Sequence, residues 1–351
     1  MSDSNFFCKK CDFSKLFHPI FRLNNDYTFL FYQGIIKNII TSGIYADKVV
    51  SFPLYIECTE HIIISLSLFS KCKNMNSPGG AILCICNTSE ISINKCTFDS
   101  CSSYGTFSSE QRSSAGGGAV AIHCSAANIS GCSFSYCTCS GLGSSFYIGC
   151  PFRQTVNVEL VSLFCIGTNQ TSEGNSWCID RANTNLNCLN NTNPNMLYHT
   201  GGHVGYYSEY ANIKYMLVMN SAAFHIYGNA LAANSSICIN DHCSFINHTA
   251  FIAIIQYYIK SHRYSNCVFN KLTGKLITKN YQDIELIYCY LDSHYITEPL
   301  NQTFCFFTEK QKTDLPLYCS PERLFEPSKN IRSQKLYYLV RILTIIMNEN
   351  Y

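Results

Sequence analysis

Acidic residues are sparse where the sequence predicts strands, and this limits the catalytic chemistry that the chain can perform. The acids on or beside predicted strands are Asp99, Glu159, Asp180, Asp241, Asp283, Glu285 and Asp292. Asp283 and Glu285 lie two residues apart on one strand, so their side chains share a face. Carbohydrate hydrolases need paired carboxyl groups, and lyases need a calcium site beside a basic residue. We expect this pair to lie on a solvated strand edge instead, and the sequence predicts no catalytic residue.

Two groups of cysteine and histidine have spacings that a metal ion could use. Cys8 and Cys11 have the two-residue separation of half a zinc site, and His18 follows nearby. No second Cys-X-X-Cys completes that site. The second group is Asp241–Cys243 with His248, but its cysteine fits the core and its histidines fit the surface. We therefore expect no metal site and no cofactor.

Cysteine is the unusual residue of this chain, with 22 in 351 residues. Several lie at repeated positions inside predicted strands: Cys96, Cys132, Cys243, Cys267 and Cys289. A free cysteine packs as a small hydrophobe, so the first interpretation is a buried ladder of stacked thiols. The second is a set of scattered disulfides, because neighbouring strands about 4.8 Å apart lie within disulfide reach. The sequence leaves both open.

The elements that position these residues are short strands in a repeating order. One pair is Ala81–Cys86 and Ile91–Phe98, and the Gly116–Gly118 run opens a second pair of the same kind. Ile91 and Ile93 show the period of two of a strand with one buried face. The period resumes at Cys96 after a slip of one residue, which predicts a bend. The glycines that precede each Ala-Ile or Ala-Val step predict a sharp corner with unusual backbone dihedrals.

Apolar anchors trace the same repeat along the chain. They include Phe69, Phe98, Phe134, Phe245, Phe269 and Leu291. Successive anchors are 29 residues apart from Phe69 to Phe98 and 22 apart from Phe269 to Leu291. A lone strand cannot bury its apolar face, but stacked copies can, and variable spacing is typical of loops on one edge. The pattern predicts an all-β solenoid of about eight to ten coils.

The part of the chain in which the strand repeat is regular divides the sequence into three segments. Residues 1–60 are predicted to be an N-terminal cap or irregular first coils, and residues 61–306 to be the solenoid, with a loop excursion at 167–212. Residues 307–351 are predicted to be a proline-punctuated link and a short capping helix. Apolar residues at helical spacing over Gln334–Met347 indicate that helix. A truncated membrane anchor is the alternative for the same stretch.

Composition excludes some classes of function. Only 14% of the residues are charged and the net charge is +2, which gives no electrostatic case for nucleic acid or an anionic membrane. The hydrophobic fraction of 47% suffices for a long core. The sequence contains no uninterrupted run of 18 apolar residues, so it predicts no ordinary membrane span. The first ten residues lack the apolar stretch of a secretory signal peptide.

The Gly-Gly-Ala-Ile step at 79–82 and the Gly-Gly-Ala-Val step at 117–120 each precede a Phe-X-X-Cys strand end. This pattern resembles the right-handed parallel β-helix repeats of polymorphic outer-membrane-type surface proteins. Similar β-helix proteins of parasitic protists often have cysteine at the positions of Cys96 and Cys132. The resemblance covers roughly residues 61–306. It implies a right-handed parallel β-helix of the pectin-lyase-like kind, displayed on a cell surface or secreted, although the sequence shows no signal peptide and leaves the localisation unknown.

The expected function is therefore that of a non-catalytic β-helix repeat protein, a surface-type adhesion or binding scaffold. Its partners would be a glycan or a host or cell-surface protein. The alternative is a carbohydrate-active lyase or hydrolase of the same fold. Asp180-Arg181 and Gly202-His203 resemble fragments of polygalacturonase motifs, but their flanking residues do not match. A third possibility is a divergent or truncated copy that has no present function.

Overall fold

The structure is a computed structural model, and its described part is all-β. It describes residues 5–9, 11–14, 21–23, 28–32, 35–37, 40–41, 54–56, 61–75, 78–104, 116–140, 143–149, 156–166, 177–180, 182–192, 203–223, 231–256, 261–278, 283–292, 301–303 and 306–308. These residues contain no helix, and thus no helix long and apolar enough to cross a membrane. The helix predicted over Gln334–Met347 lies outside them.

The strands form one sheet of 25 strands and one of four, and every pairing between described strands is parallel. Pairing sorts the strands into four columns. Column A contains β3 (Phe21–Leu23), β7 (Leu54–Ile56), the first halves of β11 (Ile82–Asn94) and β14 (Val120–Ser130), β17 (Phe146–Gly149), β19 (Trp177–Asp180), the beginnings of β21 (His203–Ala223) and β22 (Leu231–Asp241), and the ends of β23 (Ser244–Gln256) and β25 (Val268–Thr278).

Column B contains β1 (Asn5–Lys9), β4 (Thr28–Tyr32), β8 (His61–Ser65), the second halves of β11 and β14, the first halves of β18 (Val156–Ile166) and β20 (Ala182–Thr192), the middle of β21, the end of β22, β24 (Ser261–Ser265), β26 (Asp283–Ile287) and β28 (Asn301–Thr303). Column C contains β2 (Asp12–Ser14), β5 (Ile35–Lys37), β9 (Leu68–Ser70), β12 (Thr97–Asp99), β15 (Ser133–Ser135), the ends of β18 and β20, a later part of β21, the beginnings of β23 and β25, β27 (Tyr290–Asp292) and β29 (Phe306–Thr308).

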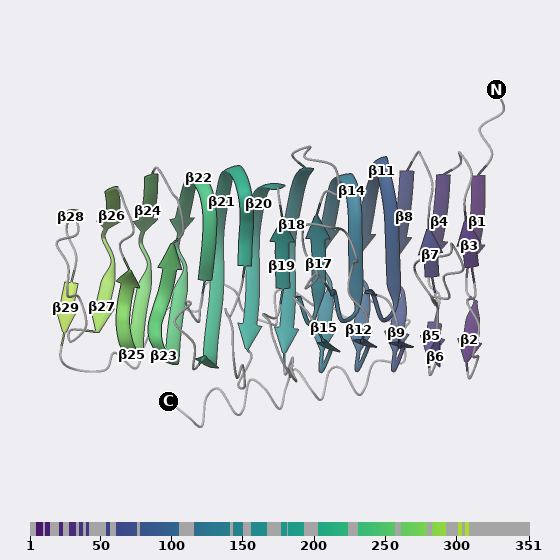
Figure 1. Cartoon of the computed structure of the whole chain (residues 1–351), viewed down its shortest axis with the longest axis horizontal. Helices are drawn as coiled ribbons and strands as arrows, with labels where there is room; N and C mark the ends of the chain where they lie inside the picture. Colours follow the sequence, from purple (N-terminus) through teal and green to yellow (C-terminus); the bar gives the residue numbers. More distant parts are fainter. Residues whose placement is uncertain are drawn as a thin grey trace.

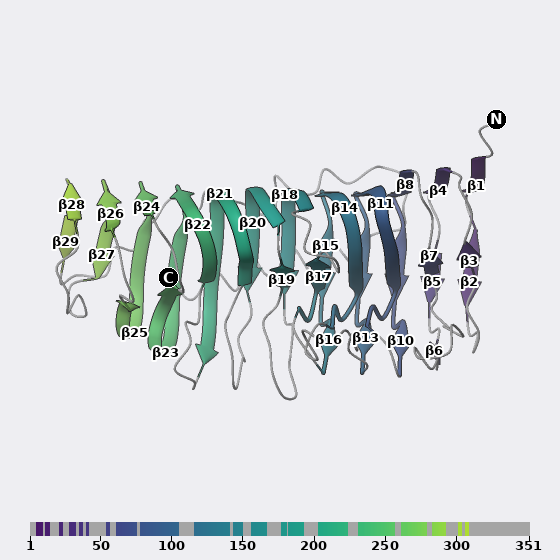
Figure 2. The same ribbon diagram turned by 45° about the horizontal axis from the view of Figure 1, so that its top comes forward.

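Column D is the small sheet, with β6 (Ile40–Thr41), β10 (Lys73–Asn74), β13 (Ser102–Ser103) and β16 (Thr138–Cys139). Figure 1 shows the strands side by side along the long axis, from purple β1 at one end to yellow β28 and β29 at the other. In Figure 2 the strands β10, β13 and β16 form a separate row below the others. Within the predicted excursion at 167–212, β19, β20 and the start of β21 also pair in parallel with their neighbours. This stacking is compatible with a solenoid.

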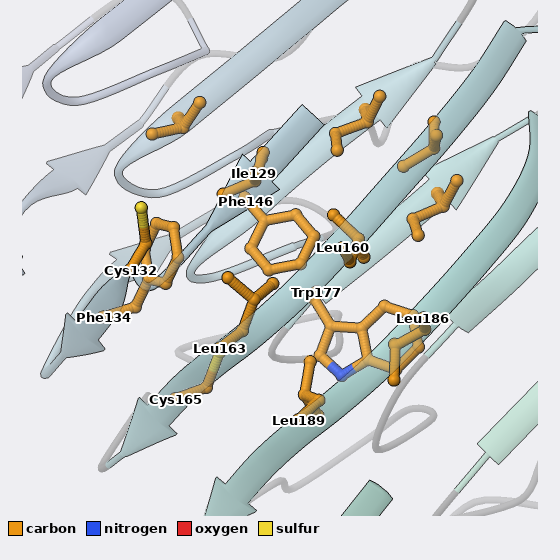
Figure 3. Close-up of a cluster of buried hydrophobic side chains, with 14 of the residues drawn as sticks. Ile129, Cys132, Phe134, Phe146, Leu160, Leu163, Cys165, Trp177, Leu186 and Leu189 are labelled. Carbon is orange, nitrogen blue, oxygen red and sulfur yellow. The ribbon is translucent and has the colours of Figure 1, made fainter. Parts of the chain in front are cut away.

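The core lies on the inward side of these columns, where one side chain stacks on its equivalent in the next strand. Phe69, Phe98 and Phe134 are fully buried, and successive ring centroids are 5.0 and 4.9 Å apart with nearly parallel planes. That distance matches the strand spacing of about 4.8 Å, so in-register strands bring like rings together. Figure 3 shows Phe146 between Phe134 and Trp177, among leucines of β18 and β20. The predicted phenylalanine anchors are confirmed at these positions.

A left-handed residue ends each described B strand from β8 to β26 and turns the chain into column C. Lys95, the residue at the predicted bend, has a φ of 52°. Its equivalents on the other strands are Leu66, Gly131, Ser162, Cys188, Tyr215, His242, Asn266 and Tyr288, which also have positive φ. We call these nine the corner residues. The bend predicted after Asn94 is therefore confirmed, and it recurs on every one of these strands.

The cysteine that follows a corner residue donates its thiol to the backbone. Cys96 Sγ lies 3.4 Å from Asn94 O, two residues back, and 3.6 Å from Ile64 O on the preceding B strand. Ser67 occupies the equivalent position after Leu66, and its hydroxyl donates to Ser65 O at 2.8 Å. The same two kinds of carbonyl accept from Cys101, Cys132, Cys137, Cys243, Cys267 and Cys289.

These cysteines are buried and form no disulfide. The ladder predicted for Cys96, Cys132, Cys243, Cys267 and Cys289 is therefore confirmed. Burial raises the pKa of the Cys96 and Cys267 thiols well above the usual value, because a buried thiolate loses its hydration. Cys188 is disulfide-bonded, so the alternative prediction of disulfides holds at that position.

The paired glycines at 79–80 and 117–118 have the corner role that the sequence predicts. Gly79 and Gly117 have φ of 75° and 65°, a region that L side chains seldom adopt. A Cβ on Gly80 would overlap the carbonyl oxygen of Gly118 on the next strand. Glycine is therefore required both for the turn and for the close approach of the two backbones.

Candidate functional site

The outward side of five neighbouring B strands carries the site. In β8 the burial alternates, with Ile62 and Ile64 buried and the residues between them facing outward. Strand pairing aligns these outward positions into three rows. The first row is His61, Glu90, Ala126, Asn157 and Asn183. The second is Ile63, Ser92, Asn128, Glu159 and Asn185, and the third is Ser65, Asn94, Ser130, Val161 and Asn187.

A concavity of about 510 Å³ lies over the first two rows. Its floor includes the largely buried Ala127, and the short side chain of Ala126 stands between the longer Glu90 and Asn157. The pairing of β11 with β14 is irregular beside it, between Cys86 and Glu90. The short side chain of Ala126 leaves space between its two longer neighbours, and we attribute the hollow to that space.

Hydrogen bonds between neighbouring strands fix part of its rim. Ser130 Oγ donates to Asn94 Oδ1 at 2.6 Å, and Asn94 Nδ2 donates to Ser92 Oγ at 2.8 Å. Ser92 lines the concavity, whereas Asn94 and Ser130 lie in the row beside it. The chain of bonds therefore orients the Ser92 hydroxyl before any ligand arrives.

The ionisable side chains that line the concavity are Glu90, Glu159 and His61. His61 Nδ1 lies 3.6 Å from Glu90 Oε2, and the two side chains are 63% and 66% exposed. Glu159 is also exposed, and no lysine or arginine is among the residues that line the hollow. Such a surface accepts and donates hydrogen bonds through carboxylate, amide and hydroxyl groups. Its two carboxyl groups repel an anionic ligand.

The acids that the sequence singled out are dispersed over the molecule. Glu285 pairs with Arg263 at 2.8 Å, while the side chain of Asp283 lies outside the described part. Asp99, on column C, accepts hydrogen bonds from Ser70, Ser100 and Ser135 at 3.0 to 3.4 Å. Among the predicted acids whose side chains the structure describes, Glu159 lines the concavity and Asp99, Asp241 and Glu285 do not.

The two groups whose spacing a metal ion could use do not assemble into a described site. Cys11 donates its thiol to Lys9 O, and the side chains of Cys8 and His18 lie outside the described residues. Asp241 lies 3.0 Å from His242 Nδ1, whereas the Cys243 thiol is directed to backbone carbonyls of the core. Within the described ranges, no group of three or more potential ligands could hold a metal ion.

Sequence reasoning missed most residues of the concavity, including His61, Glu90, Asn157 and Asn183. A usable signal existed, because every second residue before the Cys-X-Phe anchor of a repeat must face outward. Aligning the repeats on those anchors would have placed Asn128 beside Ser92, whereas the repeat of Glu159 has Cys165 where its neighbour has Phe134 and lacks the anchor.

Comparison of the chain with protein-family models, with curated proteins and with solved structures finds no match.

Proposed function

We propose that the chain is a non-catalytic binding scaffold, a right-handed parallel β-helix that presents the outward side of column B to a neutral, hydroxyl-rich ligand such as a glycan. The observation that carries the proposal is the concavity over β8, β11, β14, β18 and β20. Adhesion at a cell surface, expected from the sequence resemblance, is the setting in which such a scaffold would act.

The chemistry of the lining supports a glycan. Sugar hydroxyls both donate and accept hydrogen bonds, and Asn128, Asn157, Asn183 and Asn185 offer amides that do the same. The oriented Ser92 hydroxyl lowers the entropic cost of binding, because it is held before the ligand arrives. The carboxylates Glu90 and Glu159 disfavour a sulfated or phosphorylated ligand.

The two carboxylates in one hollow are also what favours the alternative, a carbohydrate-active enzyme. Glu159 lies two strands and two residues from Glu90, so their backbone positions are about 12 Å apart. Glycoside hydrolysis uses carboxyl groups separated by about 5 to 9.5 Å, one of them desolvated to raise its pKa. Glu90 is instead two-thirds exposed beside His61. The geometry therefore supports binding better than hydrolysis.

Binding of fluorescently labelled neutral oligosaccharides tests the proposal. Asn185 and Asn187 are both exposed asparagines on β20, but only Asn185 lines the concavity. We expect Asn185→Ala to weaken binding about tenfold, the equivalent of one hydrogen bond at about 1.4 kcal/mol, and Asn187→Ala to leave it unchanged. Ala126→Arg should abolish binding, because the long side chain fills the hollow.

Equal effects of the two asparagine substitutions would contradict the assignment of the site. If the wild type released reducing sugar and Glu90→Gln or Glu159→Gln did not, the result would favour the enzyme over the binding scaffold.

A further inference from the structure

A second exposed feature lies on column B beyond the concavity, at the corners of β21, β22, β24 and β26. Strand pairing aligns four corner residues there in the order Tyr215, His242, Asn266 and Tyr288. We call them the tyrosine strip. Tyr215 is 37% exposed and Tyr288 is 53% exposed. Neither ring is part of the core of the stack.

The corner backbone accepts tyrosine but does not require it. Tyr215 and Tyr288 have φ of 53° and 51°, a left-handed conformation that asparagine and glycine tolerate and that bulky residues seldom adopt. Asn266 and Gly131 show that the fold accepts the favoured residues at equivalent corners. Leu66 and Lys95 show that it also accepts larger side chains, so what singles out Tyr215 and Tyr288 is that they expose aromatic rings.

Between the two tyrosines, a fixed polar group holds the strip in place. Asp241 accepts hydrogen bonds from Ser265 Oγ at 2.8 Å and Asn266 Nδ2 at 3.0 Å, and His242 Nδ1 lies 3.0 Å from its other oxygen. Burial would raise the pKa of Asp241, but these bonds and the His242 ring hold it below the usual value. The His242 ring also lies against Tyr215, with centroids 5.3 Å apart. Two rings and an amide are thereby positioned across neighbouring strands.

The charges around the strip are balanced. Arg263 and Glu285, each three residues before its corner, form an ion pair at 2.8 Å. Lys214 is exposed on the strand position next to Tyr215 and pairs in register with Asp241. Such balance selects neither an anion nor a cation, so charge complementarity favours an uncharged ligand.

We propose that the tyrosine strip is a second ligand site, which binds a neutral polysaccharide chain lying across the strands. The two tyrosines are three strand spacings apart, about 14 Å, so a chain of several sugar units can contact both. Tyrosine gives a rigid face for the apolar side of a sugar ring and a hydroxyl for its edge. A protein partner fits less well, because a stable interface needs about 800 Å² on each side and the strip is a single row of four residues.

The test is affinity electrophoresis of the full chain through gels that contain a soluble polysaccharide. The neutral probes are galactomannan, β-glucan and hydroxyethylcellulose, and dextran sulfate is the anionic probe. The variants are Tyr215→Asn, Tyr288→Asn and the double variant. Asparagine suits a left-handed corner, so the variants keep the fold, which thermal unfolding checks. The matched control is Tyr136→Asn, since Tyr136 has a φ of 52° and is 50% exposed at a corner between columns C and D.

We expect at least one neutral polysaccharide to retard the wild type, each single variant to weaken retardation about fivefold or more, and Tyr136→Asn to change it less than twofold. The proposal fails if no neutral probe retards the wild type, if dextran sulfate retards it more strongly, or if the double variant and the control behave alike. Retardation lost in Ala126→Arg but kept in the double variant would overturn this proposal and leave the concavity as the glycan site. Retardation lost in the double variant and kept in Ala126→Arg would support the strip alone.

Discussion

Phe69, Phe98 and Phe134 repeat one side chain on three neighbouring C strands, whereas the outward residues of the adjoining B strands change at most steps. The first outward row reads His61, Glu90, Ala126, Asn157 and Asn183. Neighbouring strands about 4.8 Å apart give each inward ring the same space to fill in a close-packed core, so the same residue recurs. An outward side chain meets water and has no such constraint. The difference indicates that the inward rows specify the stack and the outward rows carry recognition.

A second difference separates the ends of the stack from its middle, at the position that follows each corner residue. Cysteine or serine donates a hydrogen bond there near both ends, at Ser67, Cys96 and Cys132 and again at Cys243, Cys267 and Cys289. In the middle the same position is Leu163, Leu189 or Met216. The Ser67 hydroxyl donates the same hydrogen bond as the cysteine thiols. The shared property of these residues is therefore a hydrogen-bond donor to the backbone at the corner. Disulfides are disfavoured between them because in-register strands keep Cβ atoms about 4.8 Å apart, beyond the usual 3.5 to 4.5 Å.

The largest expected effect comes from the inward rows. Phe98→Ala should lower the free energy of unfolding by about 3 to 5 kcal/mol, because it removes a ring stacked on both sides and leaves a cavity in the layer. The matched substitution is Thr97→Ala, whose side chain faces outward on the same strand. It should change the same quantity by about 0.5 kcal/mol or less. Urea unfolding followed by circular dichroism measures both.

If Thr97→Ala destabilised the chain as much as Phe98→Ala, inward and outward positions would not differ in the way that the burial pattern indicates, and the assignment of recognition to the outward rows would lose its basis.

An intermediate effect is expected at the corners. Cys132→Ala should cost about 1 to 2 kcal/mol, because the carbonyls of Ser130 and Ile93 lose their donor and a small volume is vacated. Cys132→Ser should cost less, because it restores the donor that Ser67 provides at the equivalent corner. The urea midpoints of the two variants, measured under reducing conditions, give the comparison.

The reverse order, with serine more destabilising than alanine, would show that the thiol acts at this corner as a hydrophobe and that its hydrogen bonds contribute little.

Much of the inward pattern could be predicted from the sequence, because it depends on residue type. The phenylalanine anchors, the buried cysteine ladder, the bend after Asn94 and the glycines at 79 and 117 each have a local signature. The concavity has none. It depends on the lengths of side chains that neighbour each other only across strands, and the irregular pairing between Cys86 and Glu90 shifts the count of residues between corners. The tyrosine strip was missed for the same reason, since its residues are 22 to 27 positions apart and differ in type.

The smallest effect on stability is expected at Ser130. This residue allows a direct comparison of an outward row with the adjacent inward row. Its neighbour Ile129 is buried, whereas Ser130 faces outward and donates to Asn94, which in turn donates to Ser92 at the concavity. Ser130→Ala should lower the free energy of unfolding by about 0.5 kcal/mol, because the bond is partly exposed to water. It should nevertheless weaken glycan binding by about two- to threefold, because Ser92 is no longer held in one orientation. Ile129→Val should do the opposite, costing about 1 kcal/mol of stability and leaving binding unchanged. Unfolding and binding measured on both variants separate the two roles. If Ile129→Val weakened binding as much as Ser130→Ala does, recognition would depend on the whole stack rather than on its outward rows.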